Sequence, residues 1–305
     1  MKYKSCLLLI LLLSMMFSCD PYEDYIVDTI GFTAVYFPHA EIERSAVAGE
    51  GLEIKVGAYL GGVKDNNNVE DLTFEIDPTM LDGTAYTLLP EDYYTLGSPD
   101  KITIDQGEFL GLLSVKFDSL RMANDMQLLD YNYALPFRIL STSTDSILEG
   151  KEETIIPIKL MNTYEGNFYQ VGSLKEFFTV DKVLDTAYVY GDHLDGPSTP
   201  IRELRSIMMD TVKINGVANR TGDNYSMKLK VNPEDNSVTI IADPSSDYQV
   251  EENGFSLWDP VKRRFTLKYK YSDGGKDFEV EEVLTFRNRV RDGINEWRWE
   301  GFPGN

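Results

Sequence analysis

Three tryptophans and one tyrosine are the side chains best suited to bind a sugar. An aromatic ring packs on the apolar C–H face of a pyranose, while nearby carboxylates and amides hydrogen-bond its hydroxyls. Trp258 stands in a loop-like setting, Leu-Trp-Asp-Pro. Trp297 and Trp299 are two residues apart, so a strand would place both rings on one face, as a ligand platform or, the favoured alternative, as core. Tyr190 precedes a Gly- and Pro-containing loop at 192–200, which could form a rim, although ordinary loop chemistry is favoured there.

Groups for covalent or metal chemistry are sparse. The two histidines, His39 and His193, fall in different predicted domains, and no Gly-x-Ser-x-Gly motif supplies a nucleophile. Carboxylates are plentiful, but Glu281 and Glu282 would point to opposite faces of a strand, so they cannot form a glycosidase pair, and a solvated face explains them. Residues 65–68 lack the spacing of a calcium loop. We therefore expect no cofactor, no metal and no catalysis.

The first nineteen residues predict where the protein is located. Two lysines precede an almost unbroken apolar run over residues 7–17, which is much shorter than the roughly 20 residues that span a bilayer. Ser18 and Cys19 follow, as in a lipoprotein signal peptide, although the two residues before Ser18 depart from the commonest pattern. We expect residues 1–18 to be removed and Cys19 to carry the lipid; an ordinary secretory signal beside an unrelated cysteine is the alternative.

The composition narrows the class of partner. The 305-residue chain has a formal net charge of −21, which argues against nucleic acid and anionic membranes as partners because both require clustered Lys and Arg. The balance suits a neutral polysaccharide. Beyond Cys19 there is no cysteine, so no disulfide is expected, and 42% apolar residues must supply the core. The acidic stretch after Cys19 predicts a tether over residues 19–30.

The first half of the mature chain has the pattern of a β-sandwich. Period-two alternation at 52–56, 72–76 and 101–104, with short apolar runs at 112–117, 134–140 and 154–160, predicts seven or eight strands separated by Gly, Asp and Asn turns. We expect an antiparallel sandwich over residues 31–161.

The second half has the pattern of a small antiparallel barrel. A hairpin is expected with strands at 265–271 and 278–286 around a turn at 272–277, and further strands at 166–171, 207–214, 225–231 and 238–242. Long neighbouring strands with short turns indicate a closed barrel, which leaves no exposed edges. Residues 174–180 and 200–209 alone have room for a helical turn or two. The predicted barrel covers residues 162–305.

A series of segments resembles a known family. Residues 89–96 (LPEDYYTL), 102–108 (ITIDQGE), 113–117 (LSVKF) and 133–139 (YALPFRI) resemble the immunoglobulin-like N-terminal domain of many Bacteroides surface lipoproteins. From 164–169 (YEGNFY) to 292–297 (DGINEW), the chain resembles the lipocalin-like C-terminal domain that often accompanies it. The resemblance implies an outer-membrane lipoprotein that faces the extracellular side, is associated with SusC/SusD-type glycan uptake systems and binds polysaccharide or glycoprotein glycans. It carries over no catalytic or binding residue.

These observations predict an all-β protein with an immunoglobulin-like sandwich and a lipocalin-like barrel. The expected function is a non-catalytic, surface glycan-binding accessory lipoprotein, with Trp258, Trp297, Trp299 and Tyr190 as candidate ligand-binding residues. Two alternatives stay open. A structural or adhesive protein that binds a protein partner would present a broad apolar patch without a groove. A glycan-active hydrolase, the weaker alternative, would need two carboxylates about 5–10 Å apart in a cleft.

Overall fold

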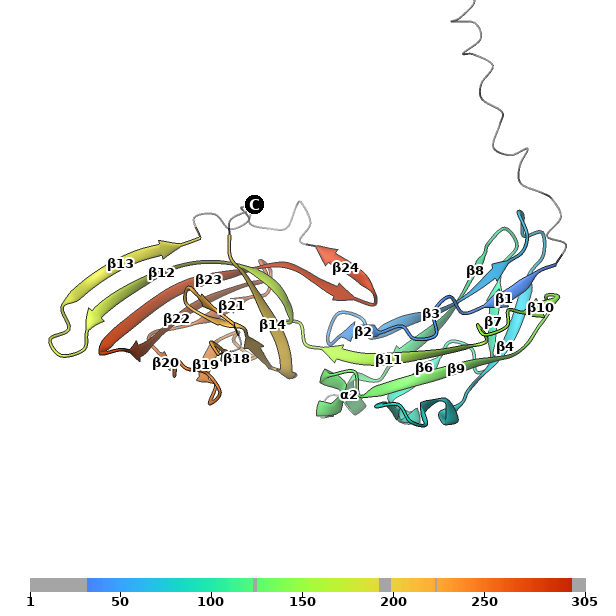
Figure 1. The fold of residues 1–305 in the computed structure, drawn as a ribbon, viewed down its shortest axis with the longest axis horizontal. Helices are drawn as coiled ribbons and strands as arrows, with labels where there is room; N and C mark the ends of the chain where they lie inside the picture. The colour runs from blue at the N-terminus through green and yellow to red at the C-terminus, as the bar shows by residue number, and fades with distance from the viewer. Residues whose placement is uncertain (1–31, 123–124, 192–198, 223, 298–305) are drawn as a thin grey trace, which may run out of the picture.

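The structure is a computed structural model that describes residues 32–122, 125–191, 199–222 and 224–297. Figure 1 shows two β units side by side. The strands up to Met161 form two sheets that pack face to face, and the strands from Gly166 onward form a strongly curved sheet. The predicted all-β fold is confirmed. In the part of the chain that the structure describes, no helix is long and apolar enough to cross a membrane.

The first unit is a sandwich of two mainly antiparallel sheets. One sheet has the order β10 (Ser146–Ile147), β1 (Ala34–Tyr36), β3 (Glu53–Gly61), β8 (Leu110–Phe117) and β6 (Tyr94–Leu96). The other has the order β2 (Arg44–Val47), β11 (Glu153–Met161), β9 (Tyr133–Thr142), β4 (Glu70–Ile76) and β7 (Lys101–Ile104), with β5 (Thr87–Leu88) beside β9. The connections hold one helical turn, α2 (Ser119–Met122), and three 3-10 turns, η3 (Pro78–Leu81), η4 (Glu91–Tyr93) and η5 (Met126–Leu129).

Side-chain alternation builds the sandwich core. In β3, Ile54, Val56 and Ala58 are buried between the sheets, while the side chains between them face outward, as the period of two requires. The same pattern in β8 contributes Val115, and β9, whose first five residues are all buried, contributes Phe137. This core consists of apolar and aromatic side chains, which is the expected basis for a domain without disulfides.

The first strand of the sandwich changes sheets. β1 pairs with β3 only at residues 59–61, and the chain then crosses to the opposite sheet, where β2 pairs with β11. Residues 53–58 of β3 are therefore paired only with β8, and their other edge borders the crossing segment. This separation opens the side of the sandwich next to the second unit.

The second unit is a nearly closed antiparallel barrel. Its strand order is β19 (Val238–Ala242), β18 (Met227–Val231), β15 (Thr211–Ile214), β14 (Ile201–Met208), β12 (Gly166–Phe178), β23 (Lys276–Arg291), β22 (Arg264–Asp273) and β20 (Glu251–Glu252). Three strands lie beside this path: β13 (Leu184–Tyr190) on β12, β21 (Leu257–Asp259) on β22 and β24 (Ile294–Trp297) on β23. A separate two-stranded ribbon joins β16 (Gly216–Val217) to β17 (Arg220–Thr221).

Backbone hydrogen bonds bring the two ends of the barrel sheet together. The Val238 N–H donates to the Ser256 carbonyl at 3.0 Å, and the Trp258 N–H donates to the Asn236 carbonyl at 2.9 Å. The expected helical turns within residues 174–180 and 200–209 are largely replaced by strands β12 and β14, because cross-strand pairing satisfies their backbone groups.

The predicted long hairpin is confirmed as β22 and β23. Its turn is tighter than expected: Asp273 pairs with Lys276, so only Gly274 and Gly275 form the loop. Their φ angles of 56° and 78° suit the left-handed conformation of a two-residue turn, which glycine adopts without steric cost.

Candidate functional site

Trp258 lies in the core of the barrel and not in a loop. It belongs to strand β21 and is 3% exposed. Its ring contacts Phe265 with centroids 4.5 Å apart and Tyr164 at 5.3 Å. These rings cover the Trp258 side chain, so the prediction that it lies in a loop and contacts a ligand is wrong. The Asp-Pro pair that suggested a loop lies at and just after the end of a short strand.

Tyr190 is half-buried and belongs to a polar cluster inside the barrel. Its hydroxyl donates to Glu282 Oε2 at 2.7 Å, and the same oxygen accepts a bond from Gln170 Nε2 at 2.6 Å. Tyr269 donates to Glu282 Oε1 at 3.1 Å. Burial raises the pKa of Glu282, while these hydrogen bonds oppose the rise. The cluster therefore anchors Tyr190 through its hydroxyl and holds a carboxylate away from solvent.

Glu281 and Glu282 do point to opposite faces, as predicted, but only one is solvated. Glu281 is exposed and pairs with Lys268 at 3.1 Å, whereas Glu282 is 2% exposed. The expected solvated face is therefore wrong for Glu282. The alternation of β23 contained the signal, because Glu282 occupies the same face as the buried Val280 and Leu284.

Trp297 is a surface residue, so the structure does not place it in the core. It is 51% exposed on β24, and the Arg287 guanidinium lies 4.7 Å from its ring centroid. Trp299 and Cys19 lie outside the described residues. Among the described candidates, Tyr190 and Trp258 lie inside the barrel, whereas Trp297 lies on the surface.

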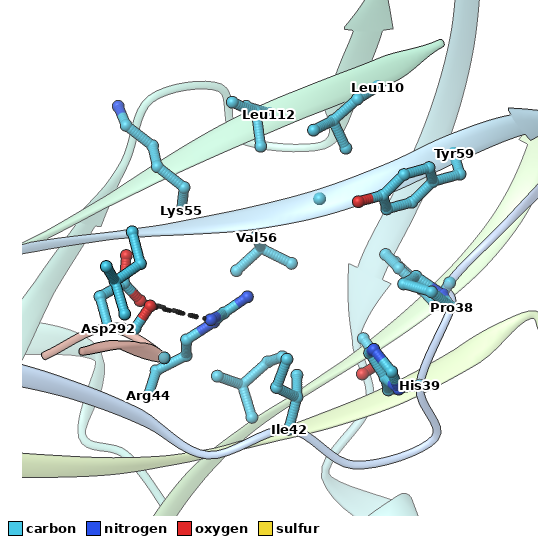
Figure 2. Close-up of a pocket in the computed structure, with 16 residues that line it drawn as sticks. Pro38, His39, Ile42, Arg44, Lys55, Val56, Tyr59, Leu110, Leu112 and Asp292 are labelled. Atoms are coloured by element: carbon cyan, nitrogen blue, oxygen red, sulfur yellow. Dashed lines mark hydrogen bonds and ion pairs between the residues drawn. The ribbon is translucent and has the colours of Figure 1, made fainter. Parts of the chain in front are cut away.

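A groove at the junction of the two units lies beside solvent-facing apolar residues (Figure 2). We call it the junction groove. It consists of one hollow of about 370 Å³ and a neighbouring hollow of about 470 Å³, which share Lys55, Asp292 and Ile294. The first hollow is lined chiefly by the sandwich, with one wall from the barrel: Phe37, Pro38, His39, Ile42, Arg44, Lys55, Val56, Gly57, Tyr59, Leu110, Leu112, Thr154, Ile156, Asp292, Gly293 and Ile294.

One side of the junction groove is apolar because it uses outward positions of β3 and β8. Tyr59 and Leu112 are 37% and 55% exposed, and Leu110 lies beside them. Gly57 keeps this wall low, since a Cβ there would approach Leu110 Cδ1 to 2.9 Å. In Figure 2 the Tyr59 hydroxyl points into the hollow. This surface offers an aromatic ring and aliphatic side chains to a ligand.

The opposite side is polar and its charges are paired. Arg44 extends from β2 into the hollow, with Nε 3.5 Å from Asp292 Oδ1 and Nη1 donating to the Asp292 carbonyl at 3.1 Å (Figure 2). Lys55 pairs with Glu53. Arg44 Nε and Asp292 Oδ1 are buried and lack a hydrogen-bond partner among the described residues. Burial raises the pKa of Asp292, and the charge of Arg44 opposes the rise. Donor and acceptor atoms thus lie side by side next to an apolar wall.

A tight turn places Asp292 in the groove. Arg291 pairs with Ile294, so Asp292 and Gly293 form a two-residue hairpin loop with φ angles of 48° and 73°. The Asp292 N–H donates to the Ser45 carbonyl of β2 at 3.0 Å. The turn between β23 and β24 is therefore docked on the sandwich.

A second group of contacts locks the two units beside the groove. Glu50, in the turn between β2 and β3, forms an ion pair with the buried Arg289 and accepts a hydrogen bond from Thr163 at 2.6 Å. Arg289 also pairs with Glu296 at 2.9 Å, and Arg291 donates to the Glu50 carbonyl. Burial alone would raise the pKa of Glu50, but the hydrogen bonds from Thr163 and Arg289 hold it below its ordinary value. We call these contacts the junction latch.

The described residues of the junction groove show no nucleophile–base pair and no metal site. His39 lines it, but no hydroxyl or thiol nucleophile hydrogen-bonded to His39 is found among the described residues. Within the same residues, no group of three His, Cys, Asp or Glu side chains could hold a metal. Asp292 is engaged by Arg44, and Glu53 is engaged by Lys55 and Ser114.

The groove could not be located from the sequence. Arg44 and Asp292 are separated by 248 positions, and their contact depends on how the two units dock. One local signal was available: an Asp-Gly pair at 292–293 marks a tight hairpin turn.

Comparisons with known proteins support the architecture. A family model described as an N-terminal domain matches residues 31–146. No curated protein matches the chain. A Bacteroides ovatus protein of unknown function has a similar structure, with a TM-score of 0.62 and 18% identity over 84% of this chain and 95% of that chain. This similarity indicates a shared fold.

Two weaker structural similarities are to other Bacteroides proteins. A multidomain protein from Bacteroides ovatus matches with a TM-score of 0.45 and 16% identity, over 87% of this chain and 100% of that chain. An auxiliary nutrient binding protein from Bacteroides thetaiotaomicron matches with a TM-score of 0.43 and 17% identity, over 91% of this chain and 97% of that chain.

Proposed function

We propose that this protein is a non-catalytic glycan-binding lipoprotein of the outer membrane that binds polysaccharide in the junction groove. The observation that carries the proposal is the lining of the groove. Tyr59 and Leu112 provide an apolar surface for the C–H face of a sugar ring, and Arg44 with Asp292 provides an adjacent donor and acceptor for neighbouring hydroxyls.

The charges of the groove favour a neutral glycan. Arg44 is paired with Asp292, and Lys55 with Glu53, so neither cation is left to attract an anionic sugar. A net charge of −21 on the whole chain also repels polyanions. Hydrogen bonds from charged groups to hydroxyls are stronger than those between neutral groups, so paired charges can still bind a neutral ligand.

The N-terminal sequence supports the proposed location at the outer membrane. A lipid on Cys19 and an acidic tether at 19–30 would hold the groove close to the cell surface, where a SusC/SusD-type transporter could receive the bound polymer. Tethering raises the effective concentration of a binding site at that surface.

The test uses soluble protein from Asp20 onward in native gels that contain amylopectin, galactomannan, yeast mannan or a mucin-type glycoprotein. We expect at least one glycan to retard the protein. Tyr59→Ala combined with Leu112→Ala should weaken that retardation at least about fivefold, a loss of about 1 kcal/mol, because the apolar surface for the sugar ring is removed. Leu140→Ala is the matched control, since Leu140 is equally exposed, at 52%, on the other sheet.

Three outcomes would count against the proposal. Retardation by no glycan would favour the adhesive alternative with a protein partner. Retardation that survives the Tyr59/Leu112 changes would place the site elsewhere. Release of oligosaccharides from a retarding glycan would support the hydrolase alternative.

A further inference from the structure

The end of the barrel farthest from the sandwich carries a larger cleft. We call it the far cleft; its volume is about 740 Å³. It lies between the ends of the β12–β13 and β22–β23 hairpins and the segment before and after β20, at the left of Figure 1. Its lining residues come from all three segments, including Phe177, Gln249, Asn253 and Phe278.

Stacked aromatic rings support one wall of the far cleft. Tyr248 and Tyr271 are 4.6 Å apart with an interplanar angle of 16°, and Tyr271 and Phe278 are 4.7 Å apart at 10°. Tyr271 is buried and stacks against both Tyr248 and Phe278, so it supports Phe278 and does not itself face a ligand. The half-buried Phe278 and Phe177 line the cleft. Because the stack holds Phe278 in place, a ligand that packs on this ring costs little side-chain entropy.

The polar groups of the far cleft match a neutral, hydroxyl-rich ligand. Gln249 Nε2 donates to the Asp243 and Ser246 carbonyls at 3.1 and 2.8 Å, which holds the amide in place and leaves its oxygen as an acceptor. Lys270 pairs with Glu251 at 3.2 Å, and Lys182 pairs with Asp277. As in the junction groove, cations are paired with carboxylates beside aromatic side chains.

We propose that the far cleft is a second glycan-binding site and that one polymer chain engages both sites. This inference rests on the proposed function for the class of ligand. Strand β23 joins the two sites: Asp277 and Phe278 line the far cleft, and Asp292, directly after the strand, lines the junction groove. Sixteen residues of strand extend at most about 53 Å. A polysaccharide of this length is therefore long enough to reach both sites, and short oligosaccharides occupy the sites separately.

Two linked sites give a measurable difference between polymer and oligosaccharide. When one chain binds at both sites, the second contact is intramolecular, and avidity can exceed single-site affinity by about 10²–10⁴. Loss of either site should then weaken polymer binding strongly while leaving the other site's affinity for a short oligosaccharide unchanged.

The experiment is titration calorimetry with paired probes: amylopectin and maltotetraose, galactomannan and its tetrasaccharide, and yeast mannan and mannotetraose. We expect two tetrasaccharides to bind per protein, and one to the far-cleft variant Phe177→Ala/Gln249→Ala or to the groove variant Tyr59→Ala/Leu112→Ala. Each variant should bind the polymer at least about tenfold more weakly than the unmodified protein. Thermal unfolding of each variant checks that it is folded, and Gln249→Ala alone, at an exposed position, replaces the double variant if Phe177→Ala unfolds it.

The outcomes separate this inference from the proposed function. One tetrasaccharide per protein, lost in the groove variant and unaffected in the far-cleft variant, would overturn the second site and leave the proposed function intact. Binding that depends on the far cleft but not on Tyr59 would overturn the two-site arrangement and the assignment of the groove. Binding of none of the six probes, together with no retardation by the mucin-type glycoprotein, would contradict both.

Discussion

The sandwich and the barrel have cores of different chemistry. In the sandwich, side chains such as Val115, Leu135 and Phe137 fill the space between the sheets, and the core cluster is apolar and aromatic. The barrel has a comparable aromatic cluster around Phe168, but it also encloses Glu282, Gln170 and Arg202, all of them at most 2% exposed.

The two cores differ in how strictly they fix the relative positions of the strands. An apolar core stabilises through buried area and packing, and it tolerates replacement by side chains of similar volume. The cluster around Glu282 joins four strands through hydrogen bonds from Gln170, Tyr190 and Tyr269. These hydrogen bonds form only when the four strands pair in this register. We interpret the barrel as the unit whose interior fixes strand positions through hydrogen bonds, and the sandwich as the unit held chiefly by packing.

The largest effect is expected when the polar cluster loses its centre. Glu282→Ala should lower the free energy of unfolding of the barrel by about 3–5 kcal/mol, because the Tyr190 and Tyr269 hydroxyls lose their acceptor and the buried Arg202 loses its carboxylate neighbour. Denaturation followed by tryptophan fluorescence measures the barrel, since all three tryptophans belong to residues 162–305. Glu282→Gln, which keeps the volume and an acceptor, should cost less. An unchanged midpoint for Glu282→Ala would remove the distinction between the two cores.

Two carboxylates should give pH dependences of opposite sign. Burial raises the pKa of Glu282, so the unfolded chain releases this proton first and stability falls as pH rises from about 4.3 through the folded pKa. Hydrogen bonds lower the pKa of Glu50, so its contribution is present above about 4.3 and is lost as pH falls through the folded pKa.

Unfolding measured against pH tests this pair. The stability difference between the unmodified protein and Glu282→Gln should shrink as pH rises, and the difference for Glu50→Gln should grow to about 1–3 kcal/mol at neutral pH. Differences of the same sign for both variants would show that the barrel interior and the junction latch do not differ in this way.

The smallest effect is expected for the exposed tryptophan. Trp297→Ala should change the free energy of unfolding by less than about 1 kcal/mol, because the side chain is half-exposed and its ring contacts the Arg287 guanidinium. Trp258→Ala is the matched comparison and should cost about 3–5 kcal/mol, since it empties a site among packed rings. Equal costs for the two changes would contradict the assignment of Trp297 to the surface and Trp258 to the core.

Local sequence patterns predicted individual strands but not the contacts between residues far apart in the sequence. Alternation identified β3 and the β22–β23 hairpin because each has one buried face, which gives a period of two. Trp258 was misplaced because a three-residue strand has too little pattern to outweigh the following Asp-Pro. The pairing of Arg44 with Asp292 depends on docking between units, which no local propensity encodes.

Because of the β23–β24 turn, replacing either unit by recombination would disrupt the junction groove. Asp292 and Ile294 are encoded with the barrel, yet they complete a groove whose other walls are encoded with the sandwich. Grafting this sandwich onto a foreign C-terminal unit would transfer only part of the groove lining. The groove therefore needs both halves of the chain, and exchange of one half would require a matching turn in its new neighbour.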